Sequence, residues 1–319
     1  MEEIHQKNDE EDELLSSLPK VWAWGFTYMY NYKGFWYRPQ VTQSMVSCQK
    51  HFEAQNTDTI IATFPKSGTT WLKALSFAIL TRAQYPSSQS PLLSFNPHHL
   101  VPFLEFELYL NKPVPDLSAL PSPRIFGTHM AYSLLPESIQ NSTCRVVYIC
   151  RNPLDAFVSL WHFINKGVGE TLPLEECFDD FCQGIAGCGP FFDHVLGYWK
   201  QSLERPYKVL FLTYEDLKED TTGTHLKRLA EFLGCPFSLE EERDGVIEEI
   251  SKLCSFNMLK DMEHNKTGNS ILDFENKTLF RRGEVGDWIN LLTPEMVERL
   301  TNIMEQKLAG SGIVFKLGP

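Results

Sequence analysis

The chain alternates between short apolar runs and longer segments in which apolar residues recur at helical spacing. Four runs are rich in Ile, Val, Phe and Tyr and short enough for buried strands; they cover residues 59–64, 124–128, 145–150 and 208–213. Helical patterns follow at 69–81, 153–165 and about 218–233. Because strands that alternate with helices are typical of α/β proteins, the pattern predicts a parallel β-sheet flanked by helices.

The remaining segments predict one domain preceded by an acidic tail. Residues 1–17 are acidic and poor in large apolar side chains, which indicates a disordered tail before a single domain at 18–319. Aromatic residues crowd the segment 22–37, where they either pack in the core or line an apolar acceptor pocket. The Pro-containing stretch 86–123 predicts long surface connections.

Charge and cysteine usage narrow the classes of function. The 41 acidic and 29 basic side chains give a formal net charge of -12, so a nucleic-acid partner is not expected and any polyanion must bind in a local basic pocket. No apolar run approaches the roughly 20 residues that span a bilayer, and the start lacks the features of a signal peptide, which predicts a cytoplasmic protein without a membrane partner. The eight cysteines form no C-x-x-C pair, and no metal site is expected.

Polar side chains follow all four predicted strands. PKSGTTW occupies residues 65–71 after the first run, and His129, Arg151 and Tyr214 follow the other three. Ligands of open parallel sheets bind outside the carboxyl ends of the strands. We therefore expect an amine, an imidazole, a guanidinium and a phenol to meet at one rim.

The PKSGTTW segment predicts a phosphate-binding strand-loop-helix that is like a P-loop. Such a loop presents free backbone N–H groups and the positive end of a helix to an anion. Its spacing is not that of Walker A, because Lys66 precedes Gly68 and the earlier glycine is missing. The alternative is an ordinary turn between a strand and a helix. In that case Lys66 would be a charged surface residue, and Gly68 would be present because the turn needs its backbone conformation.

Two further segments offer cations for phosphate. Arg151 with Ser159 suits a phosphate, although the alternatives are a surface ion pair and a hydroxyl on a helix face. FRRGEVGDW at 280–288 predicts either a second phosphate clamp or a solvated basic turn. His129 is the candidate general base, because among nine histidines it directly follows a predicted strand in a polar turn.

With these motifs in place, the sequence resembles the cytosolic sulfotransferases and is most similar to plant members that act on small hydroxylated metabolites. The resemblance runs from about residue 35 to 315. It is carried by PKSGTTWLKAL at 65–75, THM at 128–130, YICRNPLDAFVSLWHF at 148–163, FLTYEDL at 211–217, LCSF at 253–256 and LFRRGEVGDW at 279–288.

The resemblance implies transfer of a sulfuryl group from 3′-phosphoadenylyl sulfate (PAPS) to a hydroxyl of a flavonoid, another phenol or a steroid-like alcohol. His129 would accept the hydroxyl proton, Lys66 would contact the bridging oxygen, and no metal would be needed. The implied donor-binding residues are Lys66, Ser67, Gly68, Thr69, Thr70, Trp71, Arg151, Ser159, Tyr214, Arg281, Arg282 and Gly283, with Ser255 and Phe256 near the adenosine.

Two departures from the family pattern matter. Gly127 stands where many animal members have a lysine, two residues before the histidine. The dimer motif Lys-x-x-x-Thr-Val-x-x-x-Glu is half present: Thr293 and Glu298 match, whereas Ile289 and Pro294 do not, which favours a monomer. The competing hypotheses are a Mg²⁺-dependent P-loop kinase and a nucleotide-binding module without activity.

Overall fold

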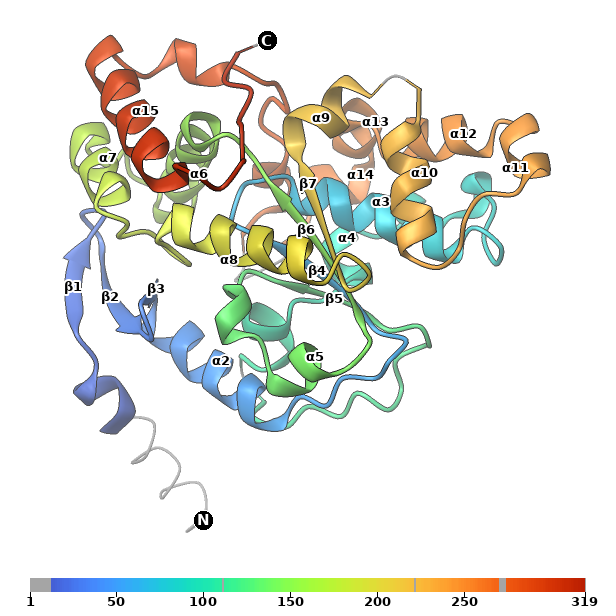
Figure 1. Ribbon diagram of the computed structural model, residues 1–319, viewed down its shortest axis with the longest axis horizontal. Coiled ribbons are helices and arrows are strands. Elements are labelled where there is room, and N and C mark those ends of the chain that lie inside the picture. Colours follow the sequence, from blue (N-terminus) through green and yellow to red (C-terminus); the bar gives the residue numbers. More distant parts are fainter. Residues whose placement is uncertain (1–12, 111, 221, 270–273, 319) are drawn as a thin grey trace.

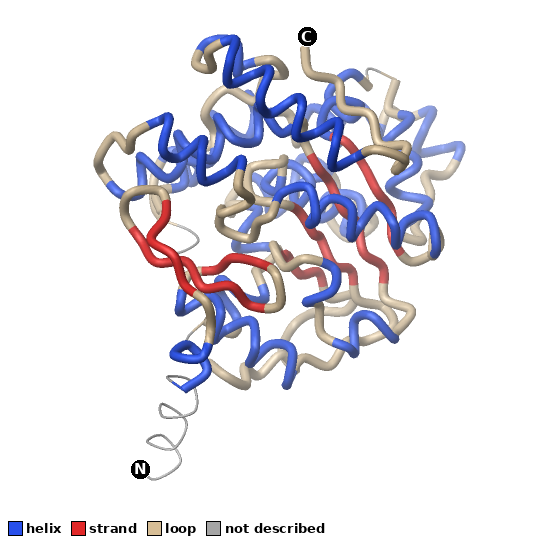
Figure 2. Tube along the Cα trace, turned by 60° about the vertical axis from the view of Figure 1, so that its left-hand side comes forward, coloured by secondary structure: helices blue, strands red, loops and turns tan. Residues whose placement is uncertain are grey.

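A parallel four-stranded sheet forms the centre of the protein (Figures 1 and 2). The structure, a computed structural model, describes residues 13–110, 112–220, 222–269 and 274–318. The strand order is β5-β4-β6-β7, with β4 at Thr59–Thr63, β5 at Ile125–Thr128, β6 at Arg145–Cys150 and β7 at Val209–Thr213. All pairs are parallel, which confirms the predicted sheet and each of its four strands to within one residue.

Helices cover both faces of this sheet, as Figure 2 shows. Along β6, Val146 and Tyr148 pack in one apolar core and Val147 and Ile149 in another, because successive side chains of a strand point to opposite faces. The first core includes α6 (Pro153–Val168) and α8 (Phe191–Glu204); the second includes α3 (Thr69–Thr81), α10 (Thr224–Phe232) and α12 (Val246–Leu253). Burial on both faces explains why the strands read as continuous apolar runs.

Shorter helices complete the fold around these layers. They are α2 (Pro39–His51), α4 (Pro97–Leu100), α5 (Glu137–Asn141), α7 (Leu174–Cys182), α9 (Tyr214–Glu219), α11 (Leu239–Arg243), α13 (Phe256–Asp261), α14 (Glu263–Lys266) and α15 (Pro294–Leu308). Single turns of tighter helix lie at Ser87–Gln89, Pro91–Leu93, Tyr132–Leu134, Asn276–Leu279 and Asp287–Asn290, and a π-helical turn lies at Leu104–Leu108.

A small antiparallel sheet near the N-terminus was not anticipated from the sequence. It consists of β1 (Lys20–Ala23), β2 (Thr27–Tyr32) and β3 (Phe35–Tyr37), and Figure 1 shows it beside α2, away from the central sheet. Trp24 and Tyr37 are buried, whereas Trp22 is 53% exposed and Tyr28 is 48% exposed. The aromatic crowding of this segment therefore reflects strands with one buried face.

The prediction of long surface connections at 86–123 is wrong for its first part. Leu92, Val101, Phe103 and Leu104 are fully buried. Prolines at the first turns of the short helices Pro91–Leu93 and Pro97–Leu100 start those helices, and Ser90 and Asn96 cap them. Proline thus acts here as a helix-starting residue rather than as a mark of a solvated loop.

Of the expected acidic tail at 1–17, residues 1–12 lie outside the described part of the chain. Residues 13–17 are helical, and Leu14 and Leu15 are half-buried there. The boundary of the single domain at residue 18 stays a prediction.

Candidate active site

The loop between β4 and α3 has a backbone that depends on glycine. Gly68 has a φ of 107°, in the left-handed region that disfavours other residues. A Cβ atom there would also lie 2.9 Å from Cδ2 of Tyr214. Lys66 has a φ of 67° without being glycine, so the loop holds this side chain in a sparsely populated conformation.

A cavity of about 390 Å³ opens at the carboxyl ends of the strands. Lys66, His129, Arg151 and Tyr214 all line it, so the groups that follow the four strands do converge. The cavity is also lined by most of the other predicted site residues, namely Gly68, Thr69, Thr70, Trp71, Ser159, Arg281, Arg282, Gly283, Ser255 and Phe256. Ser67 is the exception: it is buried outside the lining, and its hydroxyl has no hydrogen-bond partner among the described residues.

The hydrogen bonds of His129 define its tautomer. Its Nδ1 lies 2.8 Å from the carbonyl oxygen of Thr63 and 2.9 Å from the hydroxyl oxygen of that residue. A carbonyl oxygen can only accept, so Nδ1 carries the proton and Nε2 keeps a lone pair. Burial lowers the pKa of His129 to about 3, which holds the ring neutral near pH 7.

Buried polar groups hold the backbone of His129 in place. A Glu105 carboxylate oxygen accepts from the His129 amide, and the other accepts from the Thr128 hydroxyl at 2.9 Å. Burial raises the pKa of Glu105 to about 7. His194 Nε2 lies 3.1 Å from the His129 carbonyl and donates to it, and Nδ1 of the same ring accepts from Tyr148 at 3.0 Å. The sequence did not point to this network, because its members come from four separate segments.

Cations gather along one side of the cavity. Burial, together with the positive charges of Arg281, Arg151 and Lys166, lowers the pKa of Lys66 to about 7. The Lys66 ammonium lies 4.1 Å from the centroid of the Phe163 ring. In a protein of net charge -12, this local concentration of positive charge suits a ligand with several negative charges.

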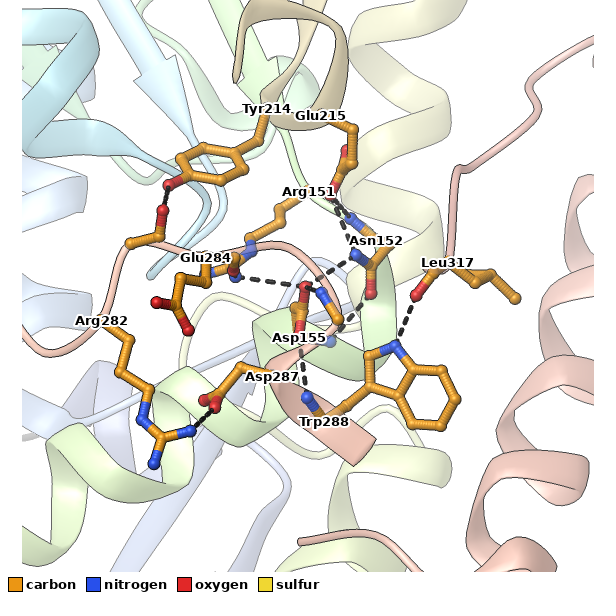
Figure 3. Close-up of polar contacts among 12 residues, drawn as sticks. Arg151, Asn152, Asp155, Tyr214, Glu215, Arg282, Glu284, Asp287, Trp288 and Leu317 are labelled. Atoms are coloured by element: carbon orange, nitrogen blue, oxygen red, sulfur yellow. Dashed lines mark hydrogen bonds and ion pairs between the residues drawn. The ribbon is translucent and has the colours of Figure 1, made fainter. Parts of the chain in front are cut away.

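Arg151 is held by the two segments that flank it in space (Figure 3). Its guanidinium pairs with Asp155 at 3.2 Å, donates to the carbonyl of Glu284 and lies 4.7 Å from the centroid of the Tyr214 ring. Its Nε is buried and has no partner among the described residues. The Tyr214 hydroxyl donates to the carbonyl of Gly283 at 2.9 Å, which joins the two phosphate-binding candidates in one wall.

Two aspartates that sequence reasoning missed organise this wall. Asp155 accepts hydrogen bonds from the backbone amides of Gly286 at 2.8 Å and Trp288 at 3.0 Å. Asp287 pairs with both arginines of the segment 280–288. Figure 3 shows its contact with Arg282. Asp287 was visible inside a quoted motif, but only the contact with the arginines distinguishes it from a solvated acid.

A lysine from α3 fills the space beside Gly127. A Cβ atom at Gly127 would lie 2.5 Å from Cε of Lys73. The Lys73 amine is fully buried, donates to the Val101 carbonyl at 2.7 Å and lies 3.0 Å from Nδ1 of His98. His98 Nε2 in turn lies 2.9 Å from the hydroxyl of Thr70 in the cavity wall. Gly127, which stands where many animal members have a lysine, therefore leaves room for a lysine from another element.

Neither a metal cluster nor a membrane helix occurs in the part of the chain that the structure describes. No group of three or more His, Cys, Asp or Glu side chains there could hold a metal ion. No helix of the described residues has the length and apolar character needed to cross a bilayer.

The fold and site define a class of protein: an α/β protein with a cavity at the carboxyl ends of its parallel strands, where cations and a neutral imidazole lie together. The Sulfotransferase domain model matches residues 56–312, and the chain belongs to this family. It is a sulfotransferase.

Named relatives agree with this assignment over nearly the whole chain. Cytosolic sulfotransferase 15 of Arabidopsis thaliana is 51% identical over 96% of this chain and 87% of its own length. Cytosolic sulfotransferase 14 of the same plant is 52% identical over 96% and 90%. The crystal structure of an Arabidopsis thaliana sulphotransferase has a TM-score of 0.77 at 44% identity and covers 95% of this chain and 94% of that one. A mouse sulfotransferase complexed with PAP has a TM-score of 0.69 at 26% identity, with coverage of 89% and 95%.

Proposed function

We propose that this protein transfers the sulfuryl group of PAPS to a hydroxyl of a small organic acceptor such as a flavonoid, another phenol or a steroid-like alcohol. One observation carries the proposal: the free Nε2 of neutral His129 and the cations Lys66 and Arg151 belong to one cavity. The mouse relative that is complexed with PAP supports this choice of donor.

The residues present fit a doubly phosphorylated nucleotide. The Nε atoms of Arg151 and Arg281 are buried without partners among the described residues, so each has a donor to offer. A Cβ atom at Gly283 would lie 2.5 Å from Phe256, so backbone and ring pack closely at that wall. In this proposal residues 66–71 hold the 5′-phosphosulfate. The 3′-phosphate contacts Arg151, Ser159, Arg281, Arg282 and Gly283, and the adenosine lies near Tyr214, Ser255 and Phe256.

The proposed reaction is an in-line displacement. The donor supplies an activated sulfuryl group. His129 Nε2 takes the proton of the acceptor hydroxyl as that oxygen bonds to sulfur and the bond from sulfur to the bridging oxygen breaks. The Lys66 ammonium stabilises the negative charge that develops on the leaving phosphate. Positioning and electrostatic stabilisation then supply most of the rate enhancement, as in phosphoryl transfer, and the proposal includes no metal.

The proposal places this enzyme in the cytoplasm as a monomer with one catalytic domain at 18–319. The names of the Arabidopsis relatives support the compartment. The half-matched dimer motif, with Ile289 and Pro294 at two of its positions, supports the monomer. Light scattering during gel filtration tests the oligomeric state, and a mass of twice 36.7 kDa would contradict it.

The test of the proposed activity uses labelled sulfate. We expect label to move from PAPS to a phenol or steroid alcohol without added Mg²⁺, and PAPS to raise the melting temperature of the protein. A protein that is stabilised by Mg-ATP alone is a kinase-like protein and contradicts the proposal. Binding of PAPS without transfer to any hydroxylated acceptor contradicts the catalytic part.

A separate experiment tests the proposed 3′-phosphate contact. Arg151→Ala should weaken binding of adenosine 3′,5′-bisphosphate (PAP) about 10- to 100-fold, because a charge-assisted bond to a buried anion is removed. Adenosine 5′-monophosphate, which lacks the 3′-phosphate, should lose far less. Equal losses in calorimetric affinity for both nucleotides would reassign Arg151.

A further inference from the structure

The acceptor end of the cavity contains a cation that the proposed reaction does not use. This end is formed by residues of the N-terminal sheet, α2 and two loops, and its walls are mainly apolar; they include Met29, Tyr37, Val41, Phe106, His129 and Cys188. Arg38 joins this lining at the start of α2. A guanidinium in an apolar wall loses hydration, so its presence there needs a compensating partner.

Arg38 has no anionic partner in the part of the chain that the structure describes. Its guanidinium makes no hydrogen bond or ion pair with another described residue and lies 4.9 Å from the centroid of the Phe26 ring. Burial lowers the pKa of Arg38, although the side chain is half-buried rather than enclosed. An arginine stays charged even so, which leaves a positive charge facing the cavity.

This charge is separate from the donor-binding cations. The groups that depress the pKa of Lys66 are Arg281, Arg151 and Lys166, and Arg38 is not among them. The Cys188 thiol opposes the lowering of the Arg38 pKa, and the Cys188 amide donates to the carbonyl of Trp36, two residues before Arg38, so both residues belong to the same N-terminal part of the cavity wall. Arg38 is therefore positioned for the acceptor rather than for the nucleotide.

A second polar group in the same wall lacks a partner. The hydroxyl of Tyr37 is buried and has no hydrogen-bond partner among the described residues, and the ring is only 1% exposed. Burial raises the pKa of Tyr37 well above its ordinary value, although the nearby Ala131 backbone opposes this. The phenol thus keeps its proton and remains a donor.

Nearby carboxylates do not neutralise Arg38. Glu105 is not part of the cavity lining, and its oxygens accept from Thr128 and His129. Asp220 does line the cavity, but it lies after α9 and accepts from the backbone amides of Thr222, Thr224 and His225. The acceptor end therefore offers a free cation and a free donor within mainly apolar walls.

We infer that the acceptor is a hydroxylated carboxylic acid whose carboxylate pairs with Arg38 while its hydroxyl reaches His129. The apolar walls contact the carbon skeleton between these two groups, and Tyr37 can donate a second hydrogen bond to the carboxylate. This inference rests on the proposed sulfuryl transfer and narrows its acceptor class.

The test compares each acid with its neutral methyl ester. The probes are ω-hydroxyhexanoic acid, ω-hydroxydodecanoic acid and 4-hydroxyphenylpropanoic acid, each assayed with its ester at saturating PAPS. We expect kcat/KM for at least one acid to exceed that for its ester, and Arg38→Gln to lower this acid-to-ester ratio about 10- to 100-fold, as loss of a charge-assisted bond predicts. Arg38→Lys should recover part of the ratio.

Controls separate this inference from the proposed function. Arg228→Gln removes an exposed arginine outside the cavity and should leave the ratio unchanged. A wild-type enzyme that sulfates phenols or steroids but favours no acid over its ester overturns the inference alone, as does an Arg38→Gln variant that loses acid and ester activity equally. A protein that neither binds PAP nor transfers sulfate overturns both.

Discussion

At the scale of single residues, burial lowers the pKa values of both His129 and Lys66, but the consequences for their charge at neutral pH differ. It lowers the pKa of His129 to about 3, so the imidazole is neutral and ready to accept a proton across the physiological range. It lowers the pKa of Lys66 to about 7, so this amine is only partly charged at neutral pH before an anion binds. The charge of the proposed base is thus insensitive to pH near 7, whereas the charge of Lys66, the proposed electrostatic partner of the donor, is sensitive.

His129→Ala should lower kcat about 10²- to 10⁴-fold, the usual contribution of a positioned general base. Affinity for PAP should change little, because the imidazole serves the acceptor. Single-turnover transfer and calorimetry measure the two quantities. His99→Ala, at an exposed histidine outside the cavity lining, is the matched control. Undiminished turnover in His129→Ala would exclude this residue as the base.

Donor capture should weaken as pH rises through about 7. Below that pH Lys66 carries its proton in the free enzyme; above it the amine is neutral and no longer attracts the phosphosulfate, so kcat/KM for PAPS should fall towards tenfold per pH unit. The bound anion favours the charged amine, so kcat at saturating PAPS should persist to higher pH. Lys66→Arg, which stays charged, should flatten the profile. A wild-type kcat/KM that is level from pH 6 to 9 contradicts the assignment.

At the scale of elements, polar contacts join the N-terminus of α6 to the C-terminal segment that carries the two arginines. Asp155 makes these contacts: it pairs with Arg151 and accepts from the amides of Gly286 and Trp288 (Figure 3). Asn152 caps α6 and Pro153 begins its first turn. Asp155 therefore lies in this first turn, where its side chain can bond to groups outside the helix. The local cap at the start of α6 therefore also positions the proposed phosphate-binding wall.

Asp155→Asn should destabilise the protein by about 3–5 kcal/mol, because removal of one partner leaves the buried Arg151 without compensation. It should also weaken PAP binding. Denaturant unfolding and calorimetry give both values. Asp193→Asn is the matched control: this aspartate also lies in the first turn of a helix, but its pair with Lys307 is exposed and should contribute little. An equal free energy of unfolding in the two variants would show that the contacts of Asp155 do not stabilise the protein.

At the scale of the whole molecule, the cavity joins parts that are far apart in sequence. The loop after β4, the start of α6 and the segment 280–286 meet only when the sheet and its covering helices are assembled. A ligand that contacts all three should stabilise the native state as a whole.

PAP at 100 times its dissociation constant should therefore add about 2.7 kcal/mol to the free energy of unfolding and raise the melting temperature by several degrees. Hydrogen exchange should slow in both 66–71 and 280–286. The effect should not require Mg²⁺. Protection confined to one of these segments would contradict a ligand that spans them.

Much of this architecture is local and was predictable. Strands buried on both faces must be continuous apolar runs, and the runs at 59–64 and 145–150 matched β4 and β6 closely. The β4–α3 loop was predictable as well, because PKSGTTW places a glycine and several hydroxyls between a strand and a helix start. The structure adds that Gly68 has a left-handed backbone close to Tyr214. The β1–β3 sheet was missed, because crowded aromatics suit core packing and strands alike.

The sequence by itself determined the sheet, the loop and the groups that follow each strand, since these depend on spacing within a few residues. Only the tertiary structure decided which partner each group has. The Gly286 amide donates to the carboxylate of Asp155, 131 positions away in the sequence, and Lys73 from α3 occupies the space that Gly127 leaves open. Such contacts follow from the packing of whole elements, and neither hydrophobic period nor motif spacing encodes them.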